Sequence, residues 1–597
     1  MKNHAAAISN PLARGKASLC HFKPRLQQLL HTLRLDVSYE RGAGDHLYYR
    51  DEAGREVEVL DLVGGYGSLL LGHAPPVLVA EAQRVLVEGR PMHAQGSRRD
   101  LAVRLADELS RRVQGDYCVI LGNSGAEAVE AAMKHAILET EGRTFIAMER
   151  GFHGKTLGAL QLTSNPQYRD PFDLSGVNVL RVPVNNVEQL EVAFAQAQDL
   201  AGFIFEPVLG EGGIRPVEPA FARRAAELCA EANVPLIADE CQTGLGRTGT
   251  FLAVEALGVR PNYIILSKAL GGGLAKISAL LVDRARYRDE FDLKHTSTYA
   301  EDDFSCAIAL KTLELIDDAV LETCRAKGGR LLEGLRGLAK QFPGVIAEVR
   351  GRGLMLAVEF CRLPRSTSFL LRFLNSQEDL AYMITGYLLN VHRIRIAPTL
   401  SDRFTLRLEP SVGISEGEIS RFLSAMEAVC ARLADGDALG LTRFITAGRE
   451  PEASVCDSPR TDGKFAAYDE DRFRLRQRHA PPIKVGWLCH MIDADGLVSL
   501  EPKFAAVPFE EREAYLAHWA SRIAPVVMGV TDIRSVTGGL VRVYPILLPF
   551  TSRWMKGLLE TRGNRRCRRR WFSRGSIWRL RCNARWWHSA NTRRLPR

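Results

Sequence analysis

The sequence predicts an α/β fold built on a mostly parallel sheet. Between residues 117 and 281, short apolar runs alternate with amphipathic helical patterns, which is typical of a parallel sheet covered by helices on both faces. The chain has 597 residues, a length that predicts two or more domains. Polar side chains and glycines follow several of the apolar runs, at the strand ends where ligands bind in such sheets.

The predicted strands of this first region share a short, continuous apolar pattern. They are Tyr117–Leu121, Thr144–Met148, Val177–Val182, Gly202–Glu206, Pro235–Asp239 and Tyr263–Ser267. Amphipathic stretches such as Glu127–Glu139 and Pro219–Ala232 predict helices between them. A second α/β region follows the first. It opens with a predicted helix over Ser305–Ile316 and has predicted strands at Val345–Arg350, Met355–Phe360, Arg393–Ala397 and Arg403–Leu408.

The formal net charge of +9 resides in the C-terminal tail. Residues 562–597 hold thirteen Arg and no Lys, Asp or Glu, so the remaining 561 residues carry a net charge of −4. The basic average is therefore no indication that the body of the protein binds nucleic acid, and we expect no such partner for it.

The sequence shows no pattern typical of a membrane span, a secretory signal or paired cysteines. No apolar run reaches the ~20 residues of a membrane-spanning helix, and residues 1–16 lack the apolar core of a secretory signal. The twelve cysteines contain no CxxC pair, which favours free thiols over disulfides or zinc. We therefore expect a cytoplasmic protein with no membrane partner and no metal site.

The first chemical motif is Asn123-Ser124-Gly125-Ala126-Glu127, placed after a predicted strand and at the start of a helix. Small residues let backbone N–H groups approach a phosphate, and the helix dipole favours an anion there. A Ser-Gly pair before a helix is also an ordinary N-cap, so the motif alone supports both interpretations.

The second motif ends the apolar strand Leu236-Ile237-Ala238 with Asp239, followed by Glu240-Cys241-Gln242-Thr243-Gly244. A carboxylate in this position can hold a positive charge in a semi-buried site. Capping of the next turn is the alternative.

The third motif places Lys268 directly after the strand Ile264-Ile265-Leu266-Ser267 and before Gly271-Gly272-Gly273. Desolvation lowers the pKa of a lysine, and the neutral amine can form a Schiff base with an aldehyde. Lys276 is the nearest rival, but it is predicted to lie past the glycines, inside the next strand. Lys268 is therefore the better candidate.

Together these motifs, with Lys268 29 residues after Asp239, resemble the class III aminotransferases of the ornithine, acetylornithine and 4-aminobutyrate type, over about residues 35–430. The resemblance implies pyridoxal 5′-phosphate (PLP) as cofactor and PLP fold type I, with a seven-stranded, mostly parallel sheet and a smaller α/β domain. It also implies a homodimer that shares its active sites across the interface. Lys268 and Asp239 would be catalytic, with Asp239 keeping the pyridine nitrogen protonated.

The resemblance assigns further cofactor-binding residues. They are Ser124, Gly125, Ala126, Phe152, His153, Glu206, Cys241, Gln242 and Thr298. Phe152, in Gly151-Phe152-His153-Gly154-Lys155-Thr156, would stack on the cofactor ring. Cys241 would pack beneath the ring, and Gln242 would bond its hydroxyl. Thr298, in His295-Thr296-Ser297-Thr298-Tyr299, would donate to the phosphate of the neighbouring subunit.

Three substrate-binding residues follow from the same resemblance: Tyr66, Glu211 and Arg407. Arg407, in Leu406-Arg407-Leu408-Glu409-Pro410, would bind a carboxylate through its two-pronged guanidinium. Glu211 would pair with Arg407 until the substrate carboxylate displaces it. The chain departs from the family at Leu209, where Gln is usual, and at Ala300-Glu301-Asp302-Asp303-Phe304, where acidic residues replace a Gly-rich stretch and point to an amine or basic group on the substrate.

The expected function is transfer of an amino group from an amino acid or ω-amine to a 2-oxo acid or aldehyde, by a ping-pong mechanism. Two alternatives stay open. One is other class III chemistry, as an aminomutase, epimerase or decarboxylase, and the other is a non-catalytic binding protein that uses the basic tail. The pair formed by Arg407 and Glu211 favours transamination, because it lets one site alternate between two substrates.

The domains expected are an N-terminal segment (1–90) that joins the small domain, a PLP-binding large domain (91–303), a small domain (304–434), a linker (435–480), an accessory module (481–557) and a basic disordered tail (558–597). The module resembles the opening of acyl-thioester reductases at residues 484–493 and 530–539, but no Gly-rich dinucleotide motif follows. A small accessory domain is the alternative.

The tail holds four of the seven tryptophans beside its arginines. This composition suits a nucleic-acid or anionic-membrane arm. Out-of-frame translation of a GC-rich gene also yields Arg, Trp and Cys without periodicity, and we favour that interpretation.

Overall fold

The computed structural model describes residues 23–51, 53–170, 172, 176–363, 366, 368–445, 530–533 and 541–543. The chain divides into two compact units. The first comprises residues 38–361 and 392–430, and the second takes in 1–37, 362–391 and 431–597. Of the predicted linker, only residues 435–445 are described, and they contain helix α15 (Ala438–Thr442) and a 3-10 turn, η4 (Arg443–Ile445).

The predicted accessory module lies outside the described residues, apart from the paired strands β18 (Val530–Ile533) and β19 (Val541–Val543). The predicted tail, 558–597, also lies outside them.

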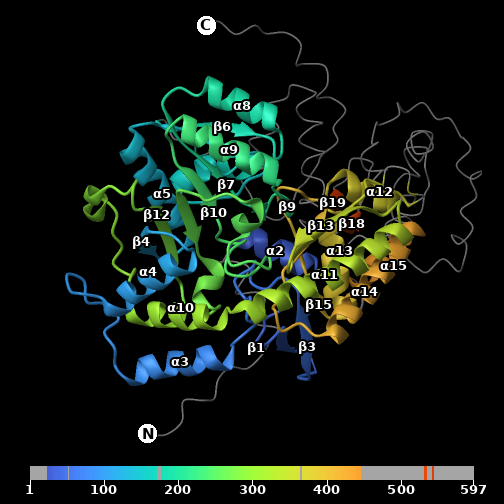
Figure 1. The fold of residues 1–597 in the computed structure, drawn as a ribbon. Coiled ribbons are helices and arrows are strands. Elements are labelled where there is room, and N and C mark those ends of the chain that lie inside the picture. The colour runs from blue at the N-terminus through green and yellow to red at the C-terminus, as the bar shows by residue number, and fades with distance from the viewer. Residues whose placement is uncertain are drawn as a thin grey trace, which may run out of the picture. The chain divides into compact units, whose positions relative to one another are not determined.

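A seven-stranded sheet forms the centre of the first unit (Figure 1). Its order is β4 (Tyr117–Gly122), β12 (Ser278–Asp283), β11 (Tyr263–Leu266), β10 (Leu236–Asp239), β7 (Leu200–Phe205), β5 (Thr144–Met148) and β6 (Asn178–Val182). Only β12 pairs antiparallel with its neighbours, so the other six strands run in one direction. The α/β fold with a seven-stranded, mostly parallel sheet is therefore confirmed.

Helices cover both faces of this sheet. The helices α5 (Gly125–Thr140) and α6 (Leu157–Leu162) contact each other, and α8 (Val187–Gln196) contacts α9 (Pro219–Glu231). Right-handed crossovers place these two pairs on opposite faces, because the chain moves along the sheet in opposite directions through them. Alanines at 128, 131, 132 and 136 form the buried side of α5, which lets the helix backbone lie close to the sheet.

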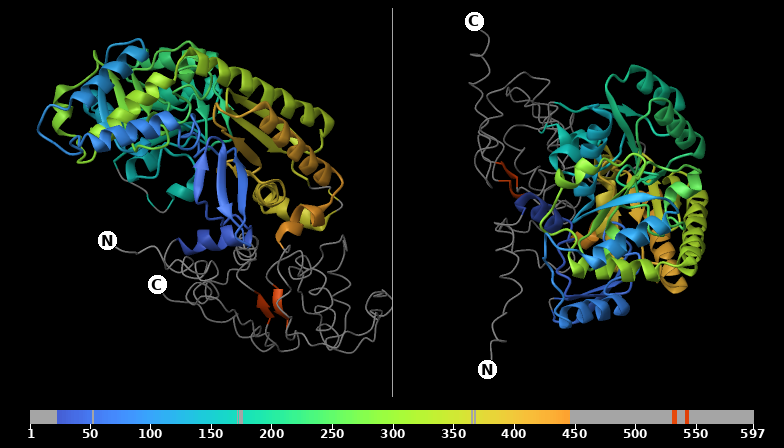
Figure 2. Two further views of the ribbon diagram at one scale, coloured as in Figure 1. Left: turned by 90° about the horizontal axis from the view of Figure 1, so that it is seen from below. Right: turned by 60° about the vertical axis from the view of Figure 1, so that its left-hand side comes forward.

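The remaining elements of the first unit form smaller layers. Helices α3 (Pro76–Val87), α4 (Asp100–Arg112) and α10 (Asp303–Leu315) pack together, and α11 (Asp318–Gln341) packs on a sheet of order β13 (Ile346–Arg352), β14 (Met355–Phe360), β17 (Thr405–Leu408) and β16 (Ala397–Pro398). A separate sheet has the order β1 (Arg41–Ala43), β2 (His46–Arg50), β3 (Glu56–Asp61) and β15 (Ile394–Arg395), and its blue strands stand apart from the central sheet in Figure 2. The short pair β8 (Val208–Leu209) and β9 (Arg215–Pro216) follows β7, and the 3-10 turns are η1 (Ala253–Leu257), η2 (Lys268–Gly271) and η3 (Asp289–Leu293).

The other described helices are α2 (Pro24–Thr32), α7 (Pro166–Arg169), α12 (Phe369–Ser376), α13 (Leu380–His392) and α14 (Glu416–Ala434). None of the helices in the described part of the chain is long and apolar enough to cross a membrane.

One predicted strand differs from the structure. Arg393–Ala397 is two short strands, because β15 pairs with β3 while β16 pairs with β17 in another sheet. The chain passes from one sheet to the next within these few residues, so the one predicted strand belongs to two sheets.

Candidate active site at the carboxyl ends of the parallel strands

Lys268 lies two residues after the end of β11 and is half-buried. Its backbone φ is +42°, a conformation that costs a non-glycine residue of order 1 kcal/mol and persists where the surroundings hold it. Ser267 helps to fix the backbone here, because its Oγ donates a hydrogen bond to the carbonyl of Ile277, at 3.0 Å. Desolvation lowers the pKa of Lys268, while the carboxylate of Glu409 is the strongest charge acting in the opposite direction. Lys276, the rival from the sequence, is exposed and precedes β12 rather than lying within it.

Asp239 ends β10 on the same edge of the sheet and is 4% exposed. One carboxylate oxygen lies 2.8 Å from Nδ1 of His153, and the other accepts from the backbone N–H of Cys241 at 3.2 Å. The N–H of His153 donates to Oγ1 of Thr163, which fixes the histidine. Within the described residues, the buried Nε2 of His153 has no hydrogen-bond partner. The carboxylate of Asp239 is thus held in one orientation.

Ser124 is the N-cap of α5, and its Oγ accepts a hydrogen bond from the N–H of Glu127. The N-cap interpretation of this motif is therefore correct. The cap does not conflict with anion binding, because the first N–H groups of a helix have no acceptor within the helix. Gly125 lies against Cys241, since a Cβ at Gly125 would be 2.8 Å from the cysteine Sγ. Ala126 similarly packs against Gly154.

Glu206 follows β7 and holds two loops that border the site. Its carboxylate accepts hydrogen bonds from the N–H of Phe152 at 2.8 Å and of Gly210 at 3.0 Å. Burial raises the pKa of Glu206 to about 7. The Phe152 ring meets the edge of Tyr168, with the ring centroids 6.2 Å apart.

Glu211 and Arg407 form an ion pair. Nη2 of Arg407 lies 3.2 Å from one oxygen of Glu211, and the guanidinium carbon lies 4.4 Å from the ring centroid of Tyr66. The other oxygen of Glu211 accepts from the hydroxyl of Tyr168 at 3.1 Å and from the N–H of Leu400 at 3.0 Å. The three residues predicted to bind substrate therefore contact one another.

Cys241 and Gln242 lie in the loop that follows β10. Gln242 donates from its side-chain amide to Glu409, and both residues are buried. Desolvation raises the pKa of the Cys241 thiol, so this side chain is a neutral group packed beside Gly125.

Two residues of the site were missed by the sequence interpretation. Glu409 stands two positions after Arg407, and the two-residue period of a strand would have placed both side chains on one face. Tyr168 has no comparable local signal, because it reaches Glu211 from a position 43 residues away.

Thr298 is the one predicted cofactor residue that the structure does not bring to the others. It is exposed, and its carbonyl accepts from the side chain of Gln95. Its neighbour Ser297 bonds Asn123 at 2.8 Å, which places this loop beside the start of α5. In the acidic departure from the family, Asp302 caps α10 and Asp303 pairs with Arg99 at 3.2 Å, so these two carboxylates stabilise the fold.

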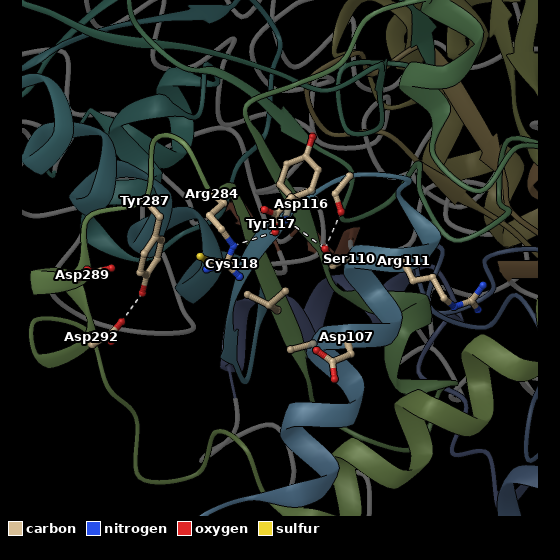
Figure 3. Close-up of a pocket in the computed structure, with 13 residues that line it drawn as sticks. Asp107, Ser110, Arg111, Asp116, Tyr117, Cys118, Arg284, Tyr287, Asp289 and Asp292 are labelled. Atoms are coloured by element: carbon tan, nitrogen blue, oxygen red, sulfur yellow. Dashed lines mark hydrogen bonds and ion pairs between the residues drawn. The ribbon is translucent and has the colours of Figure 1, made fainter.

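Figure 3 shows a surface hollow of about 620 Å³ that is lined in part by Tyr117, Cys118 and Val119, the first residues of β4. Two pairs of its lining side chains bond to each other: Arg284 with Asp116 at 2.8 Å, and Tyr287 with Asp292. Tyr117 is the first residue of β4, whereas Ser124 follows the last. The hollow is therefore not part of the site around Lys268.

The model of the family aminotransferase class-III matches residues 31–401. The ornithine aminotransferase of Toxoplasma gondii, crystallized in the presence of oxidized glutathione with partial occupancy of PLP at its active site, is 25% identical, with a TM-score of 0.59 over 70% of this chain and 93% of that chain.

Two further structures are similar. The acetylornithine aminotransferase of Elizabethkingia anophelis is 26% identical, with a TM-score of 0.54 over 66% of this chain and 94% of that one. A transaminase from the marine bacterium Virgibacillus shares the fold, with a TM-score of 0.62, 22% identity and coverage of 71% of this chain and 99% of its own.

Proposed function

The chain belongs to the class III aminotransferases, whose cofactor is PLP, and we propose that it transfers an amino group from an amino acid or ω-amine to a 2-oxo acid or aldehyde. The observation that carries this proposal is the half-buried Lys268, which lies at the end of a parallel strand on the same sheet edge as the buried carboxylate of Asp239. A lysine of lowered pKa on the same sheet edge as such a carboxylate suits carbonyl chemistry far better than a structural role.

The residues around Lys268 fit PLP. Asp239 is a buried carboxylate for the ring nitrogen, and the start of α5 offers N–H groups to the phosphate. His153 brings a buried nitrogen without a partner among the described residues. Gly125 and Gly154 keep side-chain bulk away from the loops that border this edge. When bound, PLP supplies an electron sink that stabilises negative charge at the substrate α-carbon.

The protein's own groups do the remaining work. Lys268 holds the cofactor and then, as a free amine, moves a proton at the substrate α-carbon. Asp239 keeps the ring nitrogen charged, and His153 keeps Asp239 in place. With the cofactor bound, Gln242 would bond the ring hydroxyl and Phe152 would stack on the ring.

The ion pair of Arg407 and Glu211 allows two substrates to use one site in turn, as a ping-pong mechanism requires. A substrate carboxylate takes the place of Glu211 on Arg407. The hydroxyl of Tyr168 and the N–H of Leu400 still hold the other oxygen of Glu211, so the displaced side chain keeps two partners.

We also propose that the enzyme is a homodimer in which Thr298 serves the neighbouring active site. Thr298 is exposed on a loop beside the start of α5, and the exposed apolar side chains of Leu293 (93%) and Tyr299 (66%) flank it. Burial of these side chains against a second copy would remove them from water. Sedimentation at micromolar concentration should give twice the mass of one chain, and a monomer that retains full activity would contradict the proposal.

The test of the proposed function is a half-reaction. The purified protein is loaded with PLP and mixed with single amino donors, and the visible absorbance of the lysine-bound cofactor is followed. We expect at least one amino acid or ω-amine to convert the cofactor to its amine form, and a 2-oxo acid or aldehyde to restore the original spectrum. The contrary result has two parts: no donor converts the cofactor to its amine form, and at least one donor is decarboxylated or racemised. That result would favour the other class III chemistries.

A further inference from the structure

The two carboxylate oxygens of Glu211 have different partners. Oε2 lies 3.2 Å from Nη2 of Arg407. Oε1 accepts hydrogen bonds from the hydroxyl of Tyr168 at 3.1 Å and from the N–H of Leu400 at 3.0 Å. Because Glu211 is only 7% exposed, its carboxylate depends on these protein groups. A substrate carboxylate that binds Arg407 therefore removes the partner of Oε2 and leaves both partners of Oε1.

The two donors to Oε1 stand on two segments that bond to each other. The hydroxyl donor belongs to α7, and the N–H donor directly precedes Ser401. The side-chain amide of Asn165, the N-cap of α7, donates to Oγ of Ser401 at 3.1 Å. Arg403 donates to the side-chain carbonyl of Gln167 at 2.6 Å. Both donors are therefore held in place independently of a substrate, as preorganised groups are.

The ring of Tyr168 is fixed by contacts that do not involve its hydroxyl. It meets Phe152 edge to face, with the ring centroids 6.2 Å apart and the ring planes at 83°. Nζ of Lys155 lies 3.7 Å from the centroid of the Tyr168 ring, within the range of a cation–π contact. Replacement of Tyr168 by Phe keeps both contacts, so it removes the hydrogen bond to Glu211 without removing the ring that carries it.

Displacement of Glu211 from Arg407 changes how much the Tyr168 hydrogen bond contributes. A hydrogen bond to a charged group is roughly twice as strong as one between neutral groups, and surroundings that hold little water strengthen it further. While the ion pair is intact, the guanidinium compensates the charge of Glu211. When a substrate carboxylate takes the guanidinium, the two donors at Oε1 remain to stabilise that charge. They therefore stabilise the substrate-bound state more than the free enzyme.

We propose that Tyr168 determines the preference of the site for carboxylate-bearing substrates: together with the N–H of Leu400, its hydroxyl retains Glu211 while a substrate carboxylate occupies Arg407. Tyr168 acts through Glu211 and not through a bond to substrate, so it is a positioning residue. This inference rests on the proposed function, because it requires a substrate carboxylate to replace Glu211 on Arg407.

The test is the half-reaction of the PLP-loaded full chain with the carboxylate-bearing amino donor that converts the cofactor best. The rate of conversion is measured against donor concentration. In Tyr168→Phe we expect the half-saturating concentration to rise about fivefold, as for the weakening of one charge-assisted hydrogen bond, while the maximum rate stays close to that of the wild type. In Glu211→Gln, which has no charge to displace, the additional change Tyr168→Phe should leave the half-saturating concentration the same.

Tyr48→Phe is the matched control. The hydroxyl of Tyr48 also donates to a glutamate, Glu58, at 3.1 Å, and the guanidinium carbon of Arg41 lies 3.6 Å from its ring centroid. This variant should behave as the wild type. An unchanged half-saturating concentration in Tyr168→Phe overturns the inference, and so does an equal rise with Glu211 present or replaced by Gln. A wild-type protein whose cofactor is converted by no donor contradicts the proposed function itself, which separates the two failures.

Discussion

Arg407 is the residue that we propose to bind the substrate carboxylate. It is 6% exposed, its Nη2 pairs with Glu211, and its buried Nε has no hydrogen-bond partner within the described residues. The Tyr66 ring closes one side of the guanidinium. A carboxylate can bind here with two parallel hydrogen bonds, one of them to the unpartnered Nε, which is a stronger arrangement than the single contact with Glu211.

Replacement of Arg407 by Ala should reduce kcat/KM for carboxylate-bearing substrates by at least about thirty-fold. This is the low end of the 2–5 kcal/mol lost when one partner of a buried charge pair is removed. The change also leaves Glu211 buried without its cation. Steady-state kinetics with the best amino donor provide the measurement, and a variant that keeps wild-type kcat/KM for every carboxylate substrate would contradict the role of Arg407.

The matched variant is Glu211→Gln. It keeps Arg407 and removes the charge that competes with the substrate. We expect binding of the carboxylate substrate to be retained or improved, while a substrate without a carboxylate near Arg407 binds less well. Equal losses for both substrates would mean that Glu211 does not alternate with them.

At the scale of elements, the ends of the parallel strands carry the titratable groups. Glu206 follows β7 and Glu240 follows β10, and burial raises the pKa of each to about 7. Between the ordinary carboxyl pKa and about pH 7, these two carboxyl groups are therefore protonated in the folded protein and ionised in the unfolded chain. The stability that these groups contribute is fully present below that pKa and is lost as the pH rises through about 7.

Glu240→Gln isolates this effect away from the cofactor. The variant keeps an acceptor for the N–H of Val254 and cannot ionise. We expect its free energy of unfolding, relative to wild type, to rise between about pH 4.5 and pH 7 by up to about 3 kcal/mol. Denaturant unfolding at pH 5 and pH 8 measures the difference, and a stability difference that does not change with pH would contradict a raised pKa for Glu240.

The sequence predicted these strands well, for a physical reason. Strands buried on both faces, such as β5 and β11, are apolar at every position and end where the next polar residue begins, so their limits lie within a residue of the predicted ones. Strands β2 and β3 are half-exposed and carry charged residues, so they give no comparable run and were not predicted.

The site was predictable to a similar extent. Asp239 and Lys268 follow predicted strands directly, and the topology alone brings such strand ends to one edge. The contacts of Glu211 with Tyr168 and Leu400, and of Glu409 with Gln242, join residues 43 to 189 positions apart. No local pattern records a contact of that kind, because it depends on how separate sheets and loops fold against each other.

At the scale of the whole molecule, the candidate site and the family match lie in the same part of the chain. The contacts described for the site fall between Tyr66 and Glu409, all within the first compact unit, and the family match covers residues 31–401.

A chain truncated after Ile445 should therefore bind PLP at the same stoichiometry and catalyse the same half-reaction as the full chain. Absorbance titration with PLP and thermal unfolding of both forms test this. The matched control is the full chain carrying Lys268→Ala, which should lose the cofactor band while keeping the fold. A truncated protein that folds but binds no PLP would place part of the site in the C-terminal region.

Everything proposed for this site requires that Lys268 is the lysine that binds the cofactor. The most direct measurement is borohydride reduction of the PLP-loaded protein, followed by proteolysis and mass spectrometry of the labelled peptides. We expect one pyridoxyl group per chain, on Lys268, and none in Lys268→Ala. A label on Lys276 or any other lysine, or a visible cofactor band that persists in Lys268→Ala, would contradict it.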